Sequence, residues 1–417
     1  MNAVAGQVPP GGAACFQTVA GIDHGNRASQ STGPPADRGL FLFWGGRVAY
    51  RLGLIFSTTG SYAALGRSAL AGALGAIEQT RRAGGIGIEP VIRDPGGDPA
   101  LYEAQTAELL DAGVRNIIGA ITSWSRKDMI PVLERKGGLL WYPCPYEGFE
   151  CNDHVVYLGA APNHHVVPAI DWIAAQGMSR AYLVGSNYVW GWETLRLARE
   201  RLQAHGIEVA GERFVPLGST EHGHVIDEIR AACPDCVVNS LIGPSSVSFV
   251  RGLGARDPGR RGRPGHLVSF NQTEADLDEL GPYADGLLSA GGFFAEDASP
   301  ELRAVARTHA PNGRVSAFLA TAHAAVELFA AAVARAGTDF PHAVFRATCD
   351  APVPTALGDI RIDPVMRHAA LAPRLALAGE GRFHVIDRAT APVAADPYLS
   401  HQTVPHIDRP PALRIVT

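Results

Sequence analysis

The fold of this chain is decided by residues 51–94, whose sequence is RLGLIFSTTGSYAALGRSALAGALGAIEQTRRAGGIGIEPVIRD. The start of this stretch, 52–56, is an apolar run of strand length that ends in the turn residues STTG. Leu70, Leu74 and Ile77 then recur at helical spacing, until two glycines end the helix and a second apolar run begins. A strand, a helix and a strand in succession, with short glycine-rich connections, predict a parallel sheet covered by helices.

The same alternation continues along most of the chain. Apolar runs at 116–120 and 139–142 follow helical patterns, and further runs occur at 181–184, 236–242 and 266–270. A chain of 417 residues also exceeds the usual size of one hydrophobic core. The sequence therefore predicts an α/β protein of two Rossmann-like, parallel-sheet lobes joined by a hinge.

The expected domain boundaries follow from the places where this alternation begins, breaks and ends. The chain before the first strand is rich in Pro and Gly and is expected to be a disordered leader. Each lobe is expected to combine two separate segments. The parts are a leader, 1–49, a first lobe, 50–158 plus 291–350, a second lobe, 159–290 plus 351–400, and a tail, 401–417.

The composition is that of a soluble globular protein, with 46% hydrophobic and 18% charged residues. A net charge of -5 and the lack of a dense basic face argue against direct nucleic-acid binding. Residues 1–49 lack the basic start and apolar run of a signal peptide, and no stretch approaches the ~18 apolar residues of a membrane span. These observations predict a cytoplasmic location, with a periplasmic one as the alternative if the true N-terminus differs.

Residue types that serve nucleophilic catalysis occur in the segment WYPCPYEGFEC, residues 141–151. Cys144 and Glu147, together with Lys127 upstream, supply a thiol, a carboxylate and an ammonium. Their order along the chain differs from that of nitrilases, however. Pro145 also lacks the backbone N–H that an oxyanion hole beside Cys144 would use. The segment therefore does not indicate an enzyme.

Metal and cofactor motifs are incomplete. Cys233 and Cys236 have the spacing of half a metal site, but no second Cys pair or nearby His doublet completes four ligands. His164 and His165 are adjacent and are expected at the surface. The glycine-rich segments match neither a dinucleotide-binding loop nor a Walker motif. We predict no metal, no cofactor and no catalytic residue.

A binding site is favoured by the positions of four unusual loops, STTG (57–60), TSWSRK (122–127), YPCPYEGFEC (142–151) and SNYVWGWE (186–193). Each loop follows an expected strand, and open parallel sheets bind ligands beyond the carboxyl ends of their strands. Ser123 follows the third strand, Tyr142 and Tyr146 belong to the end of the fourth, and Tyr188 comes from the second lobe. Hydroxyl groups among aromatic rings suit a small neutral polar ligand, because each buried amide group needs a hydrogen-bond partner.

A charged amino acid would need charged partners at the same loops. Arg126 and Glu147 are the candidates that these loops offer. The sequence leaves both alternatives open and favours the neutral ligand.

The same loops resemble a known family. The chain is similar to proteins with the type I periplasmic-binding-protein fold of the leucine/isoleucine/valine-binding class. Within that class it looks closest to amide-sensing negative regulators of the aliphatic amidase operon, and next to the binding proteins of urea and short-chain amide transporters. The resemblance rests on LIFSTTG (54–60), RDPGGDP (93–99), SRKDMIPVLER (125–135), YPCPYEGFE (142–150), GAAPNHH (159–165), GSNY (185–188) and ADPYL (395–399).

The resemblance implies which residues bind the ligand. The amide sensors use a Ser after strand three, a Tyr and a Thr in the turn after strand four, and a Tyr from the second lobe. This chain departs from them where Cys144 replaces the Thr and where Ile121 replaces a Tyr, which puts acetamide itself in doubt. The predicted ligand-binding set is Ser123, Tyr142, Cys144, Pro145, Tyr188, Ile121, Thr122 and Tyr146.

The resemblance also implies a function without catalysis. We expect two lobes that close on a small neutral amide or urea-like ligand, because the ligand binds the closed state more tightly. The absence of a signal-peptide pattern favours a cytoplasmic sensor whose partner is an antiterminator regulator protein. The alternative is the substrate-binding component of an ABC transporter for urea, short-chain amides or branched-chain amino acids, which docks on a membrane permease. The oligomeric state stays open, with a homodimer as one alternative.

Overall fold

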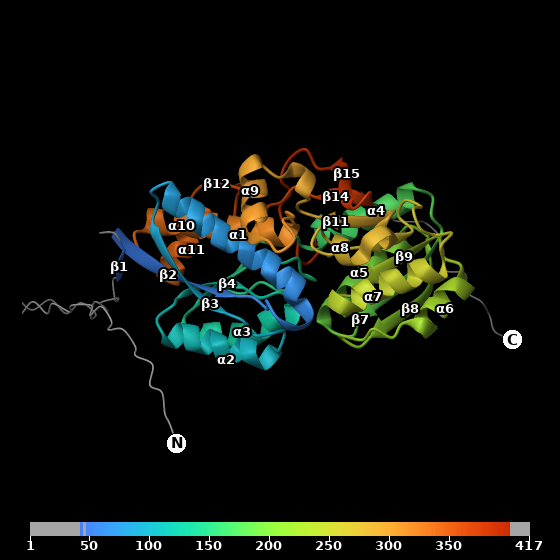
Figure 1. Ribbon diagram of the computed structural model, residues 1–417, viewed down its shortest axis with the longest axis horizontal. Coiled ribbons are helices and arrows are strands. Elements are labelled where there is room, and N and C mark those ends of the chain that lie inside the picture. The colour runs from blue at the N-terminus through green and yellow to red at the C-terminus, as the bar shows by residue number, and fades with distance from the viewer. Residues whose placement is uncertain (1–41, 45–46, 401–417) are drawn as a thin grey trace, which may run out of the picture. The chain divides into compact units, whose positions relative to one another are not determined.

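The computed structural model in Figure 1 describes residues 42–44 and 47–400, and these form two main β-sheets. Most strands of each sheet are parallel, and the antiparallel ones, β1, β14 and β15, lie toward the edges. The predicted α/β fold with parallel-sheet lobes is confirmed.

The first sheet has six strands in the order β1-β2-β4-β5-β6, with β3 on the free side of β2. Each connection from β2 to β5 is a helix, as a parallel sheet requires. The strands are β1 (Leu42–Trp44), β2 (Arg47–Ile55), β3 (Gly87–Arg93), β4 (Asn116–Gly119), β5 (Leu139–Tyr142) and β6 (Val155–Tyr157).

The second sheet has seven strands in the order β15-β14-β11-β10-β9-β7-β8. The strands are β7 (Arg180–Ser186), β8 (Glu208–Val215), β9 (Cys236–Ser240), β10 (Leu267–Ser269), β11 (Leu287–Gly291), β14 (Arg374–Gly379) and β15 (Arg382–Arg388). A small separate hairpin pairs β12 (Val353–Thr355) with β13 (Gly358–Ile360).

Helices cover both faces of each sheet. Figure 1 shows α1 and α10 on one side of the first sheet and α2 and α3 on the other. Around the second sheet, one buried cluster includes residues of α4 and α5, and another includes residues of α6 and α7. The helices are α1 (Ala63–Arg82), α2 (Pro99–Asp111), α3 (Ser123–Lys136), α4 (Val166–Ala175), α5 (Val189–Ala204), α6 (Gly223–Ala232), α7 (Gly243–Arg256), α8 (Leu277–Leu280), α9 (Pro300–His309), α10 (Ala317–Ala336) and α11 (Pro341–Cys349), with 3-10 turns η1 (Gly60–Tyr62), η2 (Pro162–His164), η3 (Gly281–Ala284) and η4 (Ala295–Asp297).

The ordered chain differs from the predicted parts in two places. Strands β1 and β2 begin inside the segment 1–49, which the sequence assigns to a disordered leader. The sequence assigns 353–371 to the second lobe, but five apolar residues of this stretch belong to the buried cluster of the first sheet. They are Val353, Ile360, Ile362, Ala369 and Leu371. The rest of the leader, and the tail 401–417, lie outside the described residues.

Helix α10 is the apolar centre of the first lobe. By length and composition alone it could cross a membrane, but most of its residues are buried inside the protein. It packs against α1 so closely that a Cβ added to Gly72 would lie 2.0 Å from the carbonyl oxygen of Leu319. Its apolar character therefore reflects burial between other helices.

Candidate functional site

A small cavity of about 30 Å³ lies where loops of the first lobe meet residues of the second. Seven of the eight predicted ligand-binding residues line it, and they come from the loops after β4 and β5 and from the start of α5. These seven are Ile121, Thr122, Ser123, Tyr142, Cys144, Pro145 and Tyr188. The structure thus brings together residues up to 67 positions apart, from Ile121 to Tyr188.

The turn from β4 into α3 places Ser123 beside the cavity. Thr122 caps the helix, since its side chain accepts a hydrogen bond from the backbone N–H of Ser125 at 3.1 Å. The Ser125 hydroxyl in turn accepts from the backbone N–H of Thr122 at 3.2 Å. This reciprocal capping box fixes the first turn of α3, and with it the position of Ser123.

Strand β5 delivers Tyr142 to the wall of the cavity. The Tyr142 side chain is buried, and its hydroxyl has no hydrogen-bond partner among the described residues. Burial raises the pKa of this phenol well above its usual value, so the group is a neutral O–H. A buried hydroxyl without a partner is costly, and a ligand could supply one.

Cys144 is held as a neutral thiol. Its Sγ donates to the carbonyl oxygen of Ala120 at 3.4 Å, and burial raises the pKa of the thiol. A nucleophilic cysteine needs the opposite, a lowered pKa and a nearby base. The geometry therefore agrees with a cavity wall and argues against covalent catalysis.

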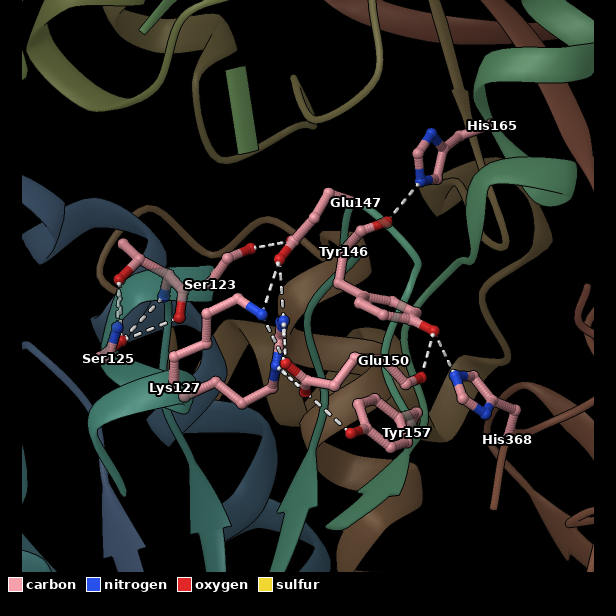
Figure 2. Close-up of polar contacts among 11 residues, drawn as sticks. Ser123, Ser125, Lys127, Tyr146, Glu147, Glu150, Tyr157, His165 and His368 are labelled. Carbon is pink, nitrogen blue, oxygen red and sulfur yellow. Dashed lines mark hydrogen bonds and ion pairs between the residues drawn. The ribbon is translucent and has the colours of Figure 1, made fainter. Parts of the chain in front are cut away.

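A buried cluster of ion pairs supports the site from behind (Figure 2). Arg126 is completely buried and contacts Glu147 at 2.9 Å and Glu150 at 2.7 Å, while Lys127 contacts Glu150 at 2.7 Å. The guanidinium of Arg126 also lies 4.8 Å from the centre of the Tyr142 ring. Burial opposes ionisation of Glu150, but the charge of Arg126 outweighs it and lowers the pKa of Glu150 to about 2.

This cluster decides what Ser123 can offer a ligand. The Ser123 hydroxyl donates a hydrogen bond to the carboxylate of Glu147 (Figure 2). Its lone pairs then remain as acceptors on the side of the cavity. Arg126 and Glu147 are paired with each other at 2.9 Å, while Nη1 of Arg126 has no partner among the described residues.

Tyr146 is the predicted residue that does not line the cavity. Its hydroxyl donates to the carbonyl oxygen of Glu150 at 3.3 Å and also contacts the ring nitrogen of His368. Its ring packs against Tyr157 with centroids 5.1 Å apart. Tyr146 therefore supports the turn after β5 from inside the first lobe (Figure 2).

Part of the lining carries no signal in the sequence. Trp190, two residues after Tyr188, is buried, and its indole N–H has no partner among the described residues. The remaining lining residues come from helix starts and a strand end where no motif marks them. They are Tyr62, Leu65, Ile242, Asn271 and Phe318.

A second cavity of about 40 Å³ adjoins the first. Pro145, Asn271 and Phe318 border both spaces. The second one is lined largely by apolar groups, including Phe293 and Leu371.

The expectation that His164 and His165 lie at the surface is wrong. Both side chains are completely buried, between the crossover after β6 and the start of α4. His164 accepts from the backbone N–H of Ala161 at 3.2 Å and bonds the carbonyl oxygen of Val393 at 3.0 Å through its other nitrogen. Burial lowers the pKa of His164 to about 4 and that of His165 to about 3.

Comparison with known proteins places this architecture in a family. The model of the family described as periplasmic binding protein domain matches residues 50–404. The chain belongs to this family. The resemblance to the type I periplasmic-binding-protein fold is thereby confirmed, while the particular closeness to amide sensors stays a prediction.

Relatives of this periplasmic binding protein have been characterised. The Leu/Ile/Val-binding protein BraC3 of Rhizobium johnstonii is 26% identical over 328 residues, which cover 74% of this chain and 86% of the relative. A solute-binding protein of an R. palustris ABC transporter, solved with 4-hydroxybenzoate, has a TM-score of 0.75 at 21% identity and covers 85% of this chain and 100% of that one. LivJ of Streptococcus pneumoniae, solved with isoleucine, has a TM-score of 0.71 at 17% identity and covers 83% and 100%.

These findings correct one prediction and support another. The predicted cytoplasmic location is wrong, because the matching family is one of periplasmic binding proteins and the relatives are solute-binding proteins. The prediction rested on the pattern of residues 1–49 alone, which is weaker evidence than a match over 50–404. The expectation of a non-enzymatic protein agrees with a family of solute-binding proteins.

Replacing Arg126 with Ala should destabilise this periplasmic binding protein by ~3–5 kcal/mol, because Glu147 would remain buried without its partner. Lys127→Ala is a matched control, since that neighbouring cation is 41% exposed and contacts the same acidic pair. It should cost about 1 kcal/mol or less. Urea unfolding followed by circular dichroism measures both, and equal losses would contradict a dominant buried cluster.

The buried histidines predict a loss of stability in mild acid. Unfolded histidine titrates near pH ~6.5, whereas the folded pKa values of His164 and His165 are about 4 and about 3. Between these values the unfolded chain binds more protons, so the free energy of unfolding should fall as the pH is lowered below ~6.5. Urea midpoints at about pH 7 and about pH 5 measure this. His164→Gln should reduce the difference, and the exposed His342→Gln should leave it unchanged.

Proposed function

We propose that this protein is the substrate-binding component of an ABC transporter and that its ligand is a small uncharged amide or urea-like molecule. The transport role is supported by the family and by relatives that are solute-binding proteins of transporters. The partner is then a membrane permease, which receives the ligand-bound form. An antiterminator partner has no comparable support among these relatives.

The observation that carries the ligand class is the absence of charge at the cavity. None of the described residues that line it is Asp, Glu, Lys or Arg. The nearest candidates, Arg126 and Glu147, are paired with each other at 2.9 Å behind the wall. An ion placed in such a space would lose its hydration without gaining a counter-charge, which costs several kcal/mol.

The hydrogen-bonding groups suit an amide. The hydroxyl of Tyr142 and the indole N–H of Trp190 are unpartnered donors that a carbonyl oxygen could accept from. The Ser123 hydroxyl donates its hydrogen bond to Glu147, so its oxygen can accept one from an N–H group. An amide or urea carries both a carbonyl and N–H groups in one small plane.

The size of the cavity supports the same class. A single water needs about 10–15 Å³ of such space, so about 30 Å³ accommodates a molecule of a few heavy atoms. An aromatic acid is larger than this space. Longer acyl amides would also need the adjoining apolar cavity behind Phe318.

A ligand panel tests the proposal. Acetamide, propionamide, butyramide and urea should raise the melting temperature, with a stabilisation of about 2.7 kcal/mol at about 100 times the Kd of an active compound. Leucine, isoleucine, benzoate and 4-hydroxybenzoate should have little effect. Stabilisation by the amino acids or the benzoates alone would overturn the ligand class.

Two tyrosine variants then test the site. Tyr142→Phe should weaken binding of the active amide by ~1–3 kcal/mol, because it removes a hydroxyl that the ligand is expected to bond. It should leave the unliganded fold intact, since that hydroxyl has no protein partner. Tyr146→Phe is the control, because its hydroxyl bonds Glu150 and His368 and should matter for stability alone. Calorimetric titration measures both, and unchanged affinity in Tyr142→Phe would remove it from the site.

A further inference from the structure

A separate cavity lies beyond the cleft, with a volume of about 500 Å³. Its walls come from the loop after β10, from η4 and α9, from the residues before α10, and from the β14–β15 hairpin. Figure 1 shows α9 beside this hairpin. The cavity shares no lining residue with the two cleft cavities, so the proposed solute site does not account for it.

Two arginines that line this cavity have no carboxylate partner among the described residues. Arg307 has no hydrogen-bond or ion-pair partner in the part of the chain that the structure describes. Arg303 donates to the carbonyl oxygens of Ala295 at 2.8 Å and Ala298 at 3.1 Å, and contacts no carboxylate. Glu296, which also lines the cavity, lies 3.8 Å from Arg388 instead. Two guanidiniums of the described lining therefore have no paired carboxylate, and the planar fork of arginine suits the oxygens of an oxyanion.

Two further arginines line the same cavity but are balanced. Arg314 pairs with Asp278 at 2.7 Å, and Arg382 pairs with Glu380 at 3.5 Å. The charge available to a ligand thus comes chiefly from α9.

An acidic group lies among these arginines. Glu274 lines the cavity and is 3% exposed. Its Oε1 accepts from the backbone N–H of Ala295 at 2.6 Å, whereas its Oε2 has no partner among the described residues. A buried carboxylate oxygen without a donor is costly, so it indicates a place for a donor from outside the protein. Burial raises the pKa of Glu274 to about 7.

We propose that this second cavity, the Glu274 cavity, binds hydrogen phosphate. Arg303 and Arg307 contact the phosphate oxygens, and the remaining O–H of the anion donates to Oε2 of Glu274. The two arginines together with the carboxylate of Glu274 select an oxyanion that keeps a proton. An oxyanion without one would place an oxygen against the carboxylate and be repelled.

The choice among anions follows from their protonation. At about pH 8, hydrogen phosphate keeps one O–H, whereas a phosphate monoester has lost its second proton because its pKa is near 6. Sulfate has no proton under these conditions. Inorganic phosphate should therefore bind, and sulfate and methyl phosphate, a monoester without a hydroxyl group, should bind at least about tenfold more weakly.

The experiment is a calorimetric titration of the full chain with sodium phosphate, sodium sulfate and methyl phosphate at about pH 8 and constant ionic strength. Glu274→Gln should remove the preference for phosphate over sulfate, since an amide can donate to either anion and still accept from Ala295. Arg307→Ala should weaken phosphate about tenfold or more, because it removes a charge-assisted bond. Arg251→Ala, an exposed arginine of α7 outside this cavity, is the matched control and should leave phosphate binding unchanged.

Three results would overturn the proposal. The first is the absence of phosphate binding to the wild-type chain. The second is an equal loss of phosphate affinity in Arg307→Ala and in the control Arg251→Ala. The third is equal affinity of the wild-type chain for phosphate, the monoester and sulfate, which would leave Glu274 without a role. Each readout is independent of the cleft, so it stands or falls separately from the proposed solute.

Discussion

Arg126 requires counter-charges because its guanidinium is completely buried, and the turn after β5 provides them through Glu147 and Glu150. These contacts tie the first turn of α3 to the end of the neighbouring strand. The site depends on that connection, since Ser123 lies on one side of it and Tyr142 on the other. A buried ion pair adds little net stability compared with apolar packing, but losing one partner is severe. Its main contribution here is to hold two loops in one fixed arrangement.

The same cluster sets the electrostatic character of the cleft. It places charged groups directly behind the cavity wall and pairs them with each other there. The cavity itself is lined by hydroxyl, thiol, indole, aromatic and aliphatic groups. Relatives with this fold have been solved with benzoates and with isoleucine, which shows that the scaffold accepts different ligands. Ligand choice in such a scaffold lies in the side chains at the strand ends.

Which loops meet at the cleft can be predicted from the sequence, because parallel sheets place the carboxyl ends of their strands at one edge. That rule alone brings Ser123, Tyr142 and Tyr188 to the cleft. It does not reveal side-chain direction after the strand ends, so it cannot show that Tyr146 turns into the first lobe or that Trp190 lines the cavity.

The burial of polar residues in loops also cannot be predicted from the local sequence. Adjacent histidines in a Pro- and Asn-containing segment suggest exposure, yet His164 finds partners in Ala161 and Val393. Val393 is 229 positions away, and no local pattern marks a contact of that separation. The return of 353–371 to the first core is similarly non-local, because the chain crosses between the lobes more than once.

The side chains between the two cleft cavities limit the length of ligand that this protein can hold. Pro145, Asn271 and Phe318 border both spaces, so shared side chains separate the cavity with hydroxyl and indole groups from a more strongly apolar one. Proline cannot swing aside, and Asn271 is anchored to the carbonyl oxygen of Leu241 at 3.3 Å. The phenyl ring of Phe318 is therefore the part of this wall that can move. Replacing it with a smaller side chain would join the two cavities and make room for longer ligands. For the proposed amide, one substitution at Phe318 would therefore change the acyl length that fits while leaving the hydroxyl and indole groups of the lining in place.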